Sequence, residues 1–110
     1  MTVSLFQRLK VNDFDAWLHP DQDMVAQMMK EQDVLAFGLH RNLDDPNLLI
    51  AHFHFADEAA AKSFIEWMEA AIKQWAIDFP DVKQEVLEWW LGADVEGTGG
   101  DTEGFNRRQI

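Results

Sequence analysis

Apolar and polar residues alternate in four short segments of the chain, which is the pattern typical of β-strands with two unlike faces. These segments span residues 3–11, 34–41, 48–55 and 84–91. The third is apolar enough to be a central strand. Between the second and third segments, residues 42–47 (NLDDPN) are rich in turn-forming side chains, so they predict a β-hairpin.

Apolar residues recur at helical spacing in two further regions. The first is expected to begin after a cap at Asn12 or Asp13 and to end near Gln32, as two helical pieces or one helix kinked at Pro20. The second begins after a cap at Asp57 and has the clearest apolar stripe in the chain. The members of that stripe are Ala61, Phe64, Ile65, Met68, Ile72 and Trp75. The predicted order is therefore β-α-β-β-α-β.

Two right-handed β-α-β crossovers place both helices on the same face of one sheet. Because side chains alternate along a strand, odd-numbered positions are expected beneath the helices and even-numbered positions on the opposite face. The odd positions of the last three strands include Leu35, Phe37, Leu39, Leu49, Ala51, Phe53, Phe55, Leu87, Trp89 and Leu91. The opposite face is expected to carry Phe6, Arg8, Ala36, Gly38, His40, Leu48, Ile50, His52, His54, Val86, Glu88 and Trp90.

The helix-free face is large and mostly apolar. Four strands of roughly 20 Å make a face on the order of 400 Å². An apolar patch of this kind usually marks an interface. We therefore expect a second copy of the chain to cover it around a two-fold axis and to enclose a cavity suited to a small molecule.

Composition excludes several classes of function. The net charge is −11, with twenty acidic and nine basic residues, so nucleic acid and anionic membranes would be repelled. A specific cationic partner is the alternative to a charge that serves solubility. Without cysteine the chain has no disulfide or thiolate chemistry. No apolar run approaches the roughly 20 residues of a membrane span, and the first residues lack the pattern of a signal peptide. A cytoplasmic protein is expected.

The chain divides into one domain, residues 1–93, and a polar, glycine-rich tail, residues 94–110. Five of the six glycines lie from Gly92 onward. The tail is interpreted as a loop or an arm that wraps around a partner.

Four motifs give the chain a resemblance to a known superfamily over about residues 3–91. They are KVNDFDAWL (residues 10–18), HRNLDDPNLLIAHFHF (40–55), DEAAAKSF (57–64) and EVLEWWL (85–91). They resemble the dimeric α/β-barrel superfamily, which includes the antibiotic-biosynthesis monooxygenase-like group. The resemblance implies an α+β, ferredoxin-like protomer with a four-stranded antiparallel sheet, and a dimeric barrel with its cavity on the helix-free face. Members include cofactor-free oxygenases, polyketide cyclases, isomerases and haem enzymes, and none of the motifs is a catalytic signature.

Three histidines are the candidate catalytic residues. His52 and His54 are two apart on a strand and share a face, and His40 can join them across the hairpin. With Glu88 they could bind zinc. A lining of polar side chains is the favoured alternative, so we predict no metal and no cofactor. One imidazole could instead act as a general base on an aromatic or polyketide-like substrate, with Arg8 stabilising the enolate.

A function in ligand binding without catalysis is an alternative. Phe6, Arg8, Ile50, Glu88 and Trp90 are the expected contacts of a small apolar or amphipathic ligand, fatty-acid-like or aromatic. A seam beside the first helix is a second location for such a ligand, since Met24, Met28 and Met29 lie there. We predict a homodimer that binds this ligand, with a cofactor-independent monooxygenase, cyclase or isomerase as the alternative. A third hypothesis is a domain that serves only assembly.

Overall fold

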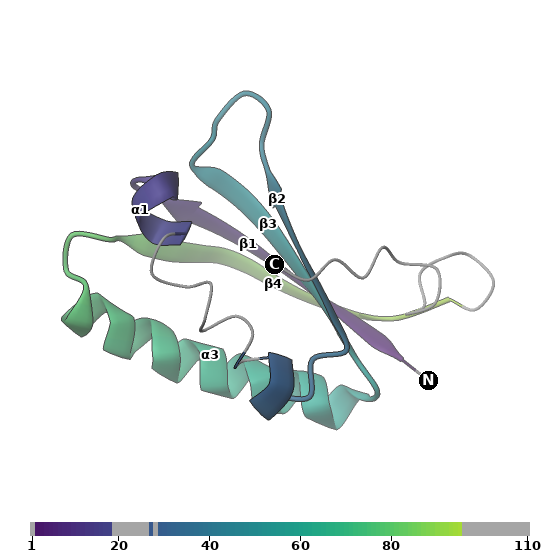
Figure 1. The fold of residues 1–110 in the computed structure, drawn as a ribbon. Coiled ribbons are helices and arrows are strands. Elements are labelled where there is room, and N and C mark those ends of the chain that lie inside the picture. The colour runs from purple at the N-terminus through teal and green to yellow at the C-terminus, as the bar shows by residue number, and fades with distance from the viewer. Residues whose placement is uncertain (1, 19–26, 28, 96–110) are drawn as a thin grey trace.

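The computed structural model describes residues 2–18, 27 and 29–95, and it has the predicted order of elements (Figure 1). The elements are β1 (Val3–Val11), α1 (Phe14–Leu18), β2 (Ala36–Arg41), β3 (Leu48–Phe55), α3 (Glu58–Asp78) and β4 (Gln84–Ala93). β1 and β3 have the predicted bounds, while β2 begins two residues later and β4 ends two residues later than expected. Residues 27 and 29–31 are also helical. Pro20, Met24 and Met28, and most of the predicted tail, lie outside the described residues.

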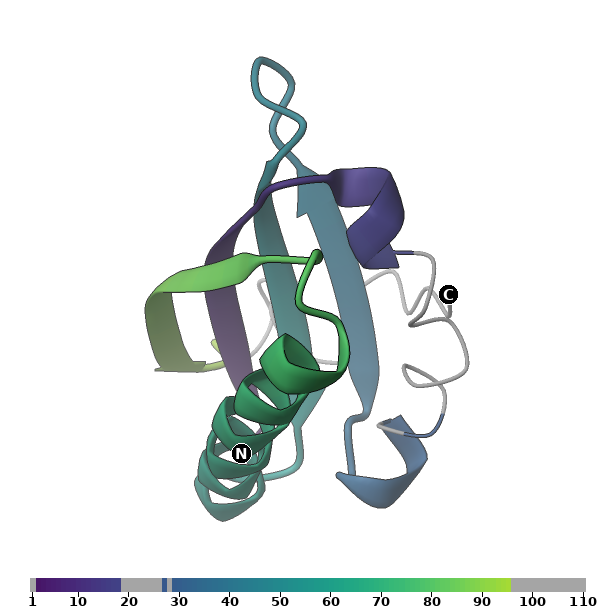
Figure 2. The same cartoon turned by 90° about the vertical axis from the view of Figure 1, so that its left-hand side faces the viewer.

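The four strands form one antiparallel sheet in the order β2-β3-β1-β4. β1 is therefore central and pairs with β3 on one side and β4 on the other. The long helix α3 lies across one face of this sheet (Figures 1 and 2). The architecture is the expected α+β, ferredoxin-like arrangement. No helix within the described ranges is long and apolar enough to cross a membrane.

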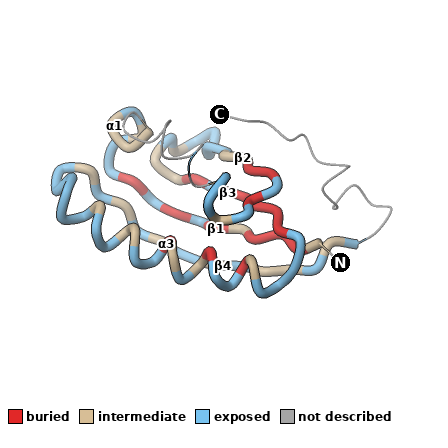
Figure 3. The backbone as a smooth tube through the Cα atoms, turned by 60° about the horizontal axis from the view of Figure 1, so that its bottom comes forward, coloured by how far each residue is buried: buried red, intermediate tan, exposed pale blue. Residues whose placement is uncertain are grey.

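The larger part of the core lies between α3 and the sheet. Phe64 of α3 is fully buried, and its ring centroid lies 4.6 Å from that of Phe53 and 5.3 Å from that of Phe55. The helix begins as predicted at Asp57, whose side chain accepts a hydrogen bond from the backbone N–H of Ala60. Buried residues concentrate on β1 and β3 (Figure 3). The apolar stripe of α3 therefore meets the odd-numbered face of these strands, as predicted.

The short helix α1 covers the other end of the same face. Phe14 and Trp17 pack against a second cluster of buried residues formed by Leu9, Val11 and Leu49. These three are again odd-numbered positions of β1 and β3. Both helices thus lie on one side, and the even-numbered side of the sheet carries neither of them.

A β-bulge in β4 makes part of the predicted alternation wrong. Arg8 of β1 pairs with Glu88, but the next residue, Leu9, pairs with Val86, so Leu87 is skipped. Val86 therefore shares a face with Leu9 beneath the helices and not with Glu88, because directly paired residues point the same way. Leu87, expected in the core, is 42% exposed.

Leu35 is a second correction. It precedes β2 and is 48% exposed, although the alternating pattern placed it beneath the helices. Its backbone N–H still donates to the carbonyl of His54 at 2.8 Å. The chain is thus hydrogen-bonded to β3 here before β2 begins at Ala36.

Candidate functional site

All eight residues predicted for the site lie on the face of the sheet opposite α1 and α3. The strand registers arrange this face in cross-strand rows that run from β2 through β3 and β1 to β4. Row one is Ala36, His54, Ser4 and Gly92; row two is Gly38, His52, Phe6 and Trp90; row three is His40, Ile50, Arg8 and Glu88. We call these three rows the open face. The predicted residues are therefore neighbours, although three separate strand pairings bring them together.

Two glycines allow aromatic rings to lie flat on the open face. A β-carbon added at Gly38 would overlap the imidazole of His52. A β-carbon at Gly92 would overlap the indole of Trp90 in the same way. Any other residue at these positions would lift the rings away from the strands, so the glycines determine how the rings are placed.

The middle of the open face is aromatic and apolar. The Phe6 ring lies with its centroid 5.6 Å from that of Trp90 and 6.2 Å from that of His52. Trp90 is 55% exposed and Ile50 is 42% exposed. This exposed surface borders the histidines directly, as a binding site for an aromatic or aliphatic group requires.

His40 and His52 form a hydrogen-bonded pair. Nε2 of His40 lies 3.0 Å from Nδ1 of His52, and the predicted approach of His40 across the hairpin is therefore observed. His52 is nearly buried, and this burial, followed by the positive charges that His40 and His54 can carry, lowers the pKa of His52 from 6.5 to about 4. At pH 7 the His52 imidazole is neutral.

Arg8 and Glu88 form an ion pair at the far side of the open face. Nη1 of Arg8 lies 3.0 Å from Oε1 of Glu88, and both side chains are about half exposed. Row three is four residues from row one along β1, a distance of about 13 Å. An enolate beside His54 would therefore lie beyond the reach of Arg8.

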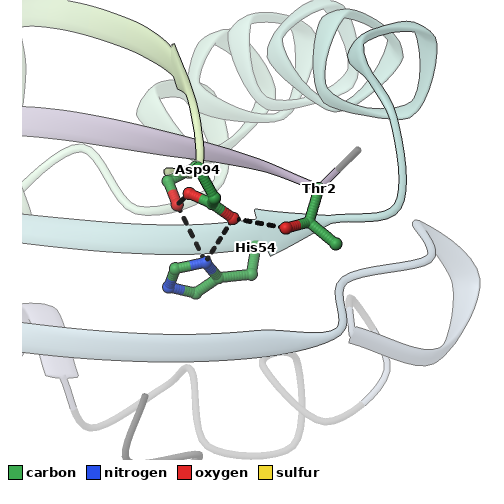
Figure 4. A network of polar contacts seen from close by, with 4 residues as sticks. Thr2, His54 and Asp94 are labelled. Carbon is green, nitrogen blue, oxygen red and sulfur yellow. Dashed lines mark hydrogen bonds and ion pairs between the residues drawn. The ribbon is translucent and has the colours of Figure 1, made fainter. Parts of the chain in front are cut away.

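The opposite end of the open face carries a polar network that the sequence patterns did not reveal (Figure 4). His54, which has no exposed surface, lies with Nδ1 2.9 Å from Oγ of Ser4. The Ser4 hydroxyl donates to Oδ1 of Asp94, and the Thr2 hydroxyl donates to Oδ2 of Asp94 at 2.7 Å. Oδ2 of Asp94 also lies 3.8 Å from Nδ1 of His54. A histidine is thus linked to a carboxylate through a serine.

Sequence reasoning missed the roles of Thr2, Ser4 and Asp94. The alternation along β1 put Ser4 on the correct face, but nothing local indicated its partners. Asp94 was counted with the tail. It joins the site because β4 continues to Ala93, where it pairs with Val3, and because the backbone N–H of Asp94 donates to the carbonyl of Thr2 at 3.0 Å.

The zinc hypothesis gains no geometric support. Within the described ranges, no three histidine or carboxylate side chains are grouped so that they could hold a metal ion. In particular, His40 and His52 turn their nitrogens toward each other, while Nδ1 of His54 meets Ser4.

Among the described residues, a groove of about 530 Å³ lies between α3 and β4 and is lined in part by Ile72, Val86 and Trp89.

No family model matches the chain, and no curated protein matches it. Solved structures do. The chain is similar to SnoaB, a cofactor-independent oxygenase from Streptomyces nogalater, with a TM-score of 0.63 and 15% identity over 88% of this chain and 96% of that one. It is also similar to a dimeric ferredoxin-like protein from an uncultured marine organism, with a TM-score of 0.60 and 12% identity over 84% of this chain and 95% of that one.

A third similar structure, from Deinococcus radiodurans, is named for a proposed antibiotic-biosynthesis monooxygenase activity. Its TM-score is 0.59, with 15% identity over 88% of this chain and 95% of that one. At these identities the likeness concerns the fold alone. The α+β, ferredoxin-like fold expected from the motifs is confirmed.

Proposed function

We propose that the chain forms a homodimer through its open face and that the enclosed space is a substrate site. The proposal rests on exposed apolar side chains, Ile50 and Trp90, on the face opposite α1 and α3. A two-fold pairing would bury both side chains and enclose the space above the open face. The similar marine protein is described as dimeric, which supports the same assembly here.

The activity that the geometry supports best is proton abstraction from an aromatic or polyketide-like substrate, without a cofactor. One observation carries this proposal: a neutral imidazole, His52, lies between an aromatic surface and two further imidazoles. Phe6 and Trp90 would stack on a ring system. One of the three histidines would take a proton from a phenol or an acidic C–H group.

The electron pair left on the substrate can then react in three ways. It can take a proton at another carbon, which is isomerisation. It can attack a carbonyl of the same molecule, which is cyclisation. It can react with dioxygen as oxidant, in which case the substrate supplies the electrons. The likeness to a cofactor-independent oxygenase supports this class of chemistry, and the third outcome within it.

The test is turnover of a panel of phenolic and polyketide-like compounds, followed by product analysis and dioxygen consumption. His52→Ala and His54→Ala are expected to abolish turnover of any substrate found, with the dimer intact. Lys62→Ala is the matched control, because Lys62 lies on α3 with its side chain 65% exposed, on the other side of the sheet. Full activity in both histidine variants would refute the mechanism.

Binding without turnover is the second candidate, and the position of Arg8 favours it. A fatty-acid-like ligand could place its chain on Phe6, Ile50 and Trp90 and its carboxylate on Arg8, displacing Glu88. Native mass spectrometry of the protein purified from cells would reveal a retained ligand. Arg8→Ala should weaken its retention, and an unchanged ligand occupancy would contradict this candidate.

A further inference from the structure

We infer that Ser4 is a positioning residue that keeps the proton of neutral His54 on Nδ1, so that Nε2 is the basic nitrogen of that ring. The inference rests on the proposed function, since it assigns a defined state to one histidine of the proposed site. It concerns a buried residue that acts through its neighbours His54 and Asp94.

The three groups are brought together by three different parts of the chain. Ser4 and His54 are directly paired residues of β1 and β3, so their side chains leave the sheet side by side. Asp94 follows β4 immediately and reaches both of them. Ser4 thus lies between the carboxylate and the imidazole, and its oxygen contacts both.

Counting protons decides the direction of each hydrogen bond. Asp94 accepts from two hydroxyl groups, those of Thr2 and Ser4, which is the behaviour of an ionised carboxylate. A serine hydroxyl has one proton, and that proton is used on Asp94. The Ser4 oxygen can therefore meet Nδ1 of His54 only as an acceptor, so Nδ1 must carry a proton.

Burial strengthens the preference of His54 for this tautomer. Ser4 is 4% exposed and His54 is 0% exposed, so water does not compete for the bond. The opposite tautomer would turn the Nδ1 lone pair toward the Ser4 oxygen and lose the hydrogen bond. A preference of about tenfold or more for the Nδ1–H form is expected from the loss of one buried hydrogen bond.

The other two histidines contact each other, with Nε2 of His40 3.0 Å from Nδ1 of His52. The Asp94–Ser4 pair contacts His54. This pair leaves Nε2 of His54 as the acceptor nitrogen of the ring. It also places a carboxylate oxygen of Asp94 3.8 Å from Nδ1, close to the positive charge that the ring carries once Nε2 has taken up a proton.

The experiment is long-range ¹H–¹⁵N NMR of the full chain labelled with ¹⁵N-histidine, without ligand and at a pH at which the spectrum shows the His54 ring to be neutral. His54 is expected to show a protonated Nδ1 and a lone pair on Nε2. If Nε2 carries the proton and Nδ1 is unprotonated in the wild-type protein, the inference is wrong.

Variants separate positioning from simple structural support. Ser4→Ala should abolish the tautomer preference, and Ser4→Thr, which retains the hydroxyl, should restore it. Thr2→Val is the matched control: it removes a hydroxyl from the same carboxylate but leaves the Ser4–His54 bond, so the tautomer should remain. An unchanged tautomer in Ser4→Ala, or an equal loss in Thr2→Val, contradicts the inference.

The NMR measurement needs no substrate, so its outcome is independent of the proposed function. A protein that turns over nothing in the compound panel would refute the activity and leave the tautomer result standing. If a substrate is found, Ser4→Ala should lower kcat more than it raises KM, because the buried Ser4 hydroxyl acts through the His54 ring.

Discussion

Acidification is expected to destabilise the fold through His52. Its pKa is lowered from 6.5 in the unfolded chain to about 4 in the folded protein, first by burial and then by His40 and His54. The unfolded state therefore binds this proton more readily between these two values. Stability from this source is present above pH 6.5 and is lost as the pH falls toward 4.

The size of the effect follows from the pKa shift. A difference of 2.5, between 6.5 and about 4, corresponds to about 3 kcal/mol of unfolding free energy, because each unit is about 1.4 kcal/mol. The 9% exposure of His52 keeps solvent screening small. Carboxylates also titrate in this range, so the informative quantity is the difference between the wild type and His52→Gln at each pH.

Urea unfolding followed by far-UV circular dichroism, at a fixed protomer concentration between pH 7 and pH 4, measures this difference. The wild type should lose about 3 kcal/mol more than His52→Gln over that range. His40→Gln, with its charge removed, should show a smaller loss than the wild type, but most of it should remain because burial is the larger cause. Parallel pH profiles for the wild type and His52→Gln would refute the reasoning.

Three further changes test the fold and the open face. Gly38→Ala should cost about 1–3 kcal/mol in urea unfolding, because its β-carbon overlaps the His52 ring; an unchanged midpoint would show that the ring moves freely. Phe64→Ala, at the centre of the core, should cost about 3–5 kcal/mol by the same measurement, and a loss below 1 kcal/mol would contradict its central position. Ile50→Glu should convert the dimer to a monomer in light scattering, whereas Ile77→Glu, on an exposed position of α3, should leave the dimer; equal behaviour of the two variants would exclude the open face as the interface.

Local patterns in the sequence determined most of the fold. Strict alternation in β1 and β3, the apolar stripe of α3 and the cap at Asp57 are each produced by neighbours within a few residues, so the sequence shows them directly. The same alternation determined which face carries the three histidines. It also placed Phe6, Arg8, Ile50, Glu88 and Trp90 on that face, because the period of a strand is two wherever the ladder is regular.

Only the tertiary structure decided how these residues meet. The bulge at Leu87 reverses the facing of Val86, and it arises from the pairing of β4 with β1, which no local pattern reveals. The Thr2–Ser4–Asp94–His54 network joins residues as many as 92 positions apart, and it exists because β1 lies between β3 and β4. Composition and alternation predict faces and elements, whereas hydrogen-bond partners depend on strand order and register, which are properties of the folded sheet as a whole.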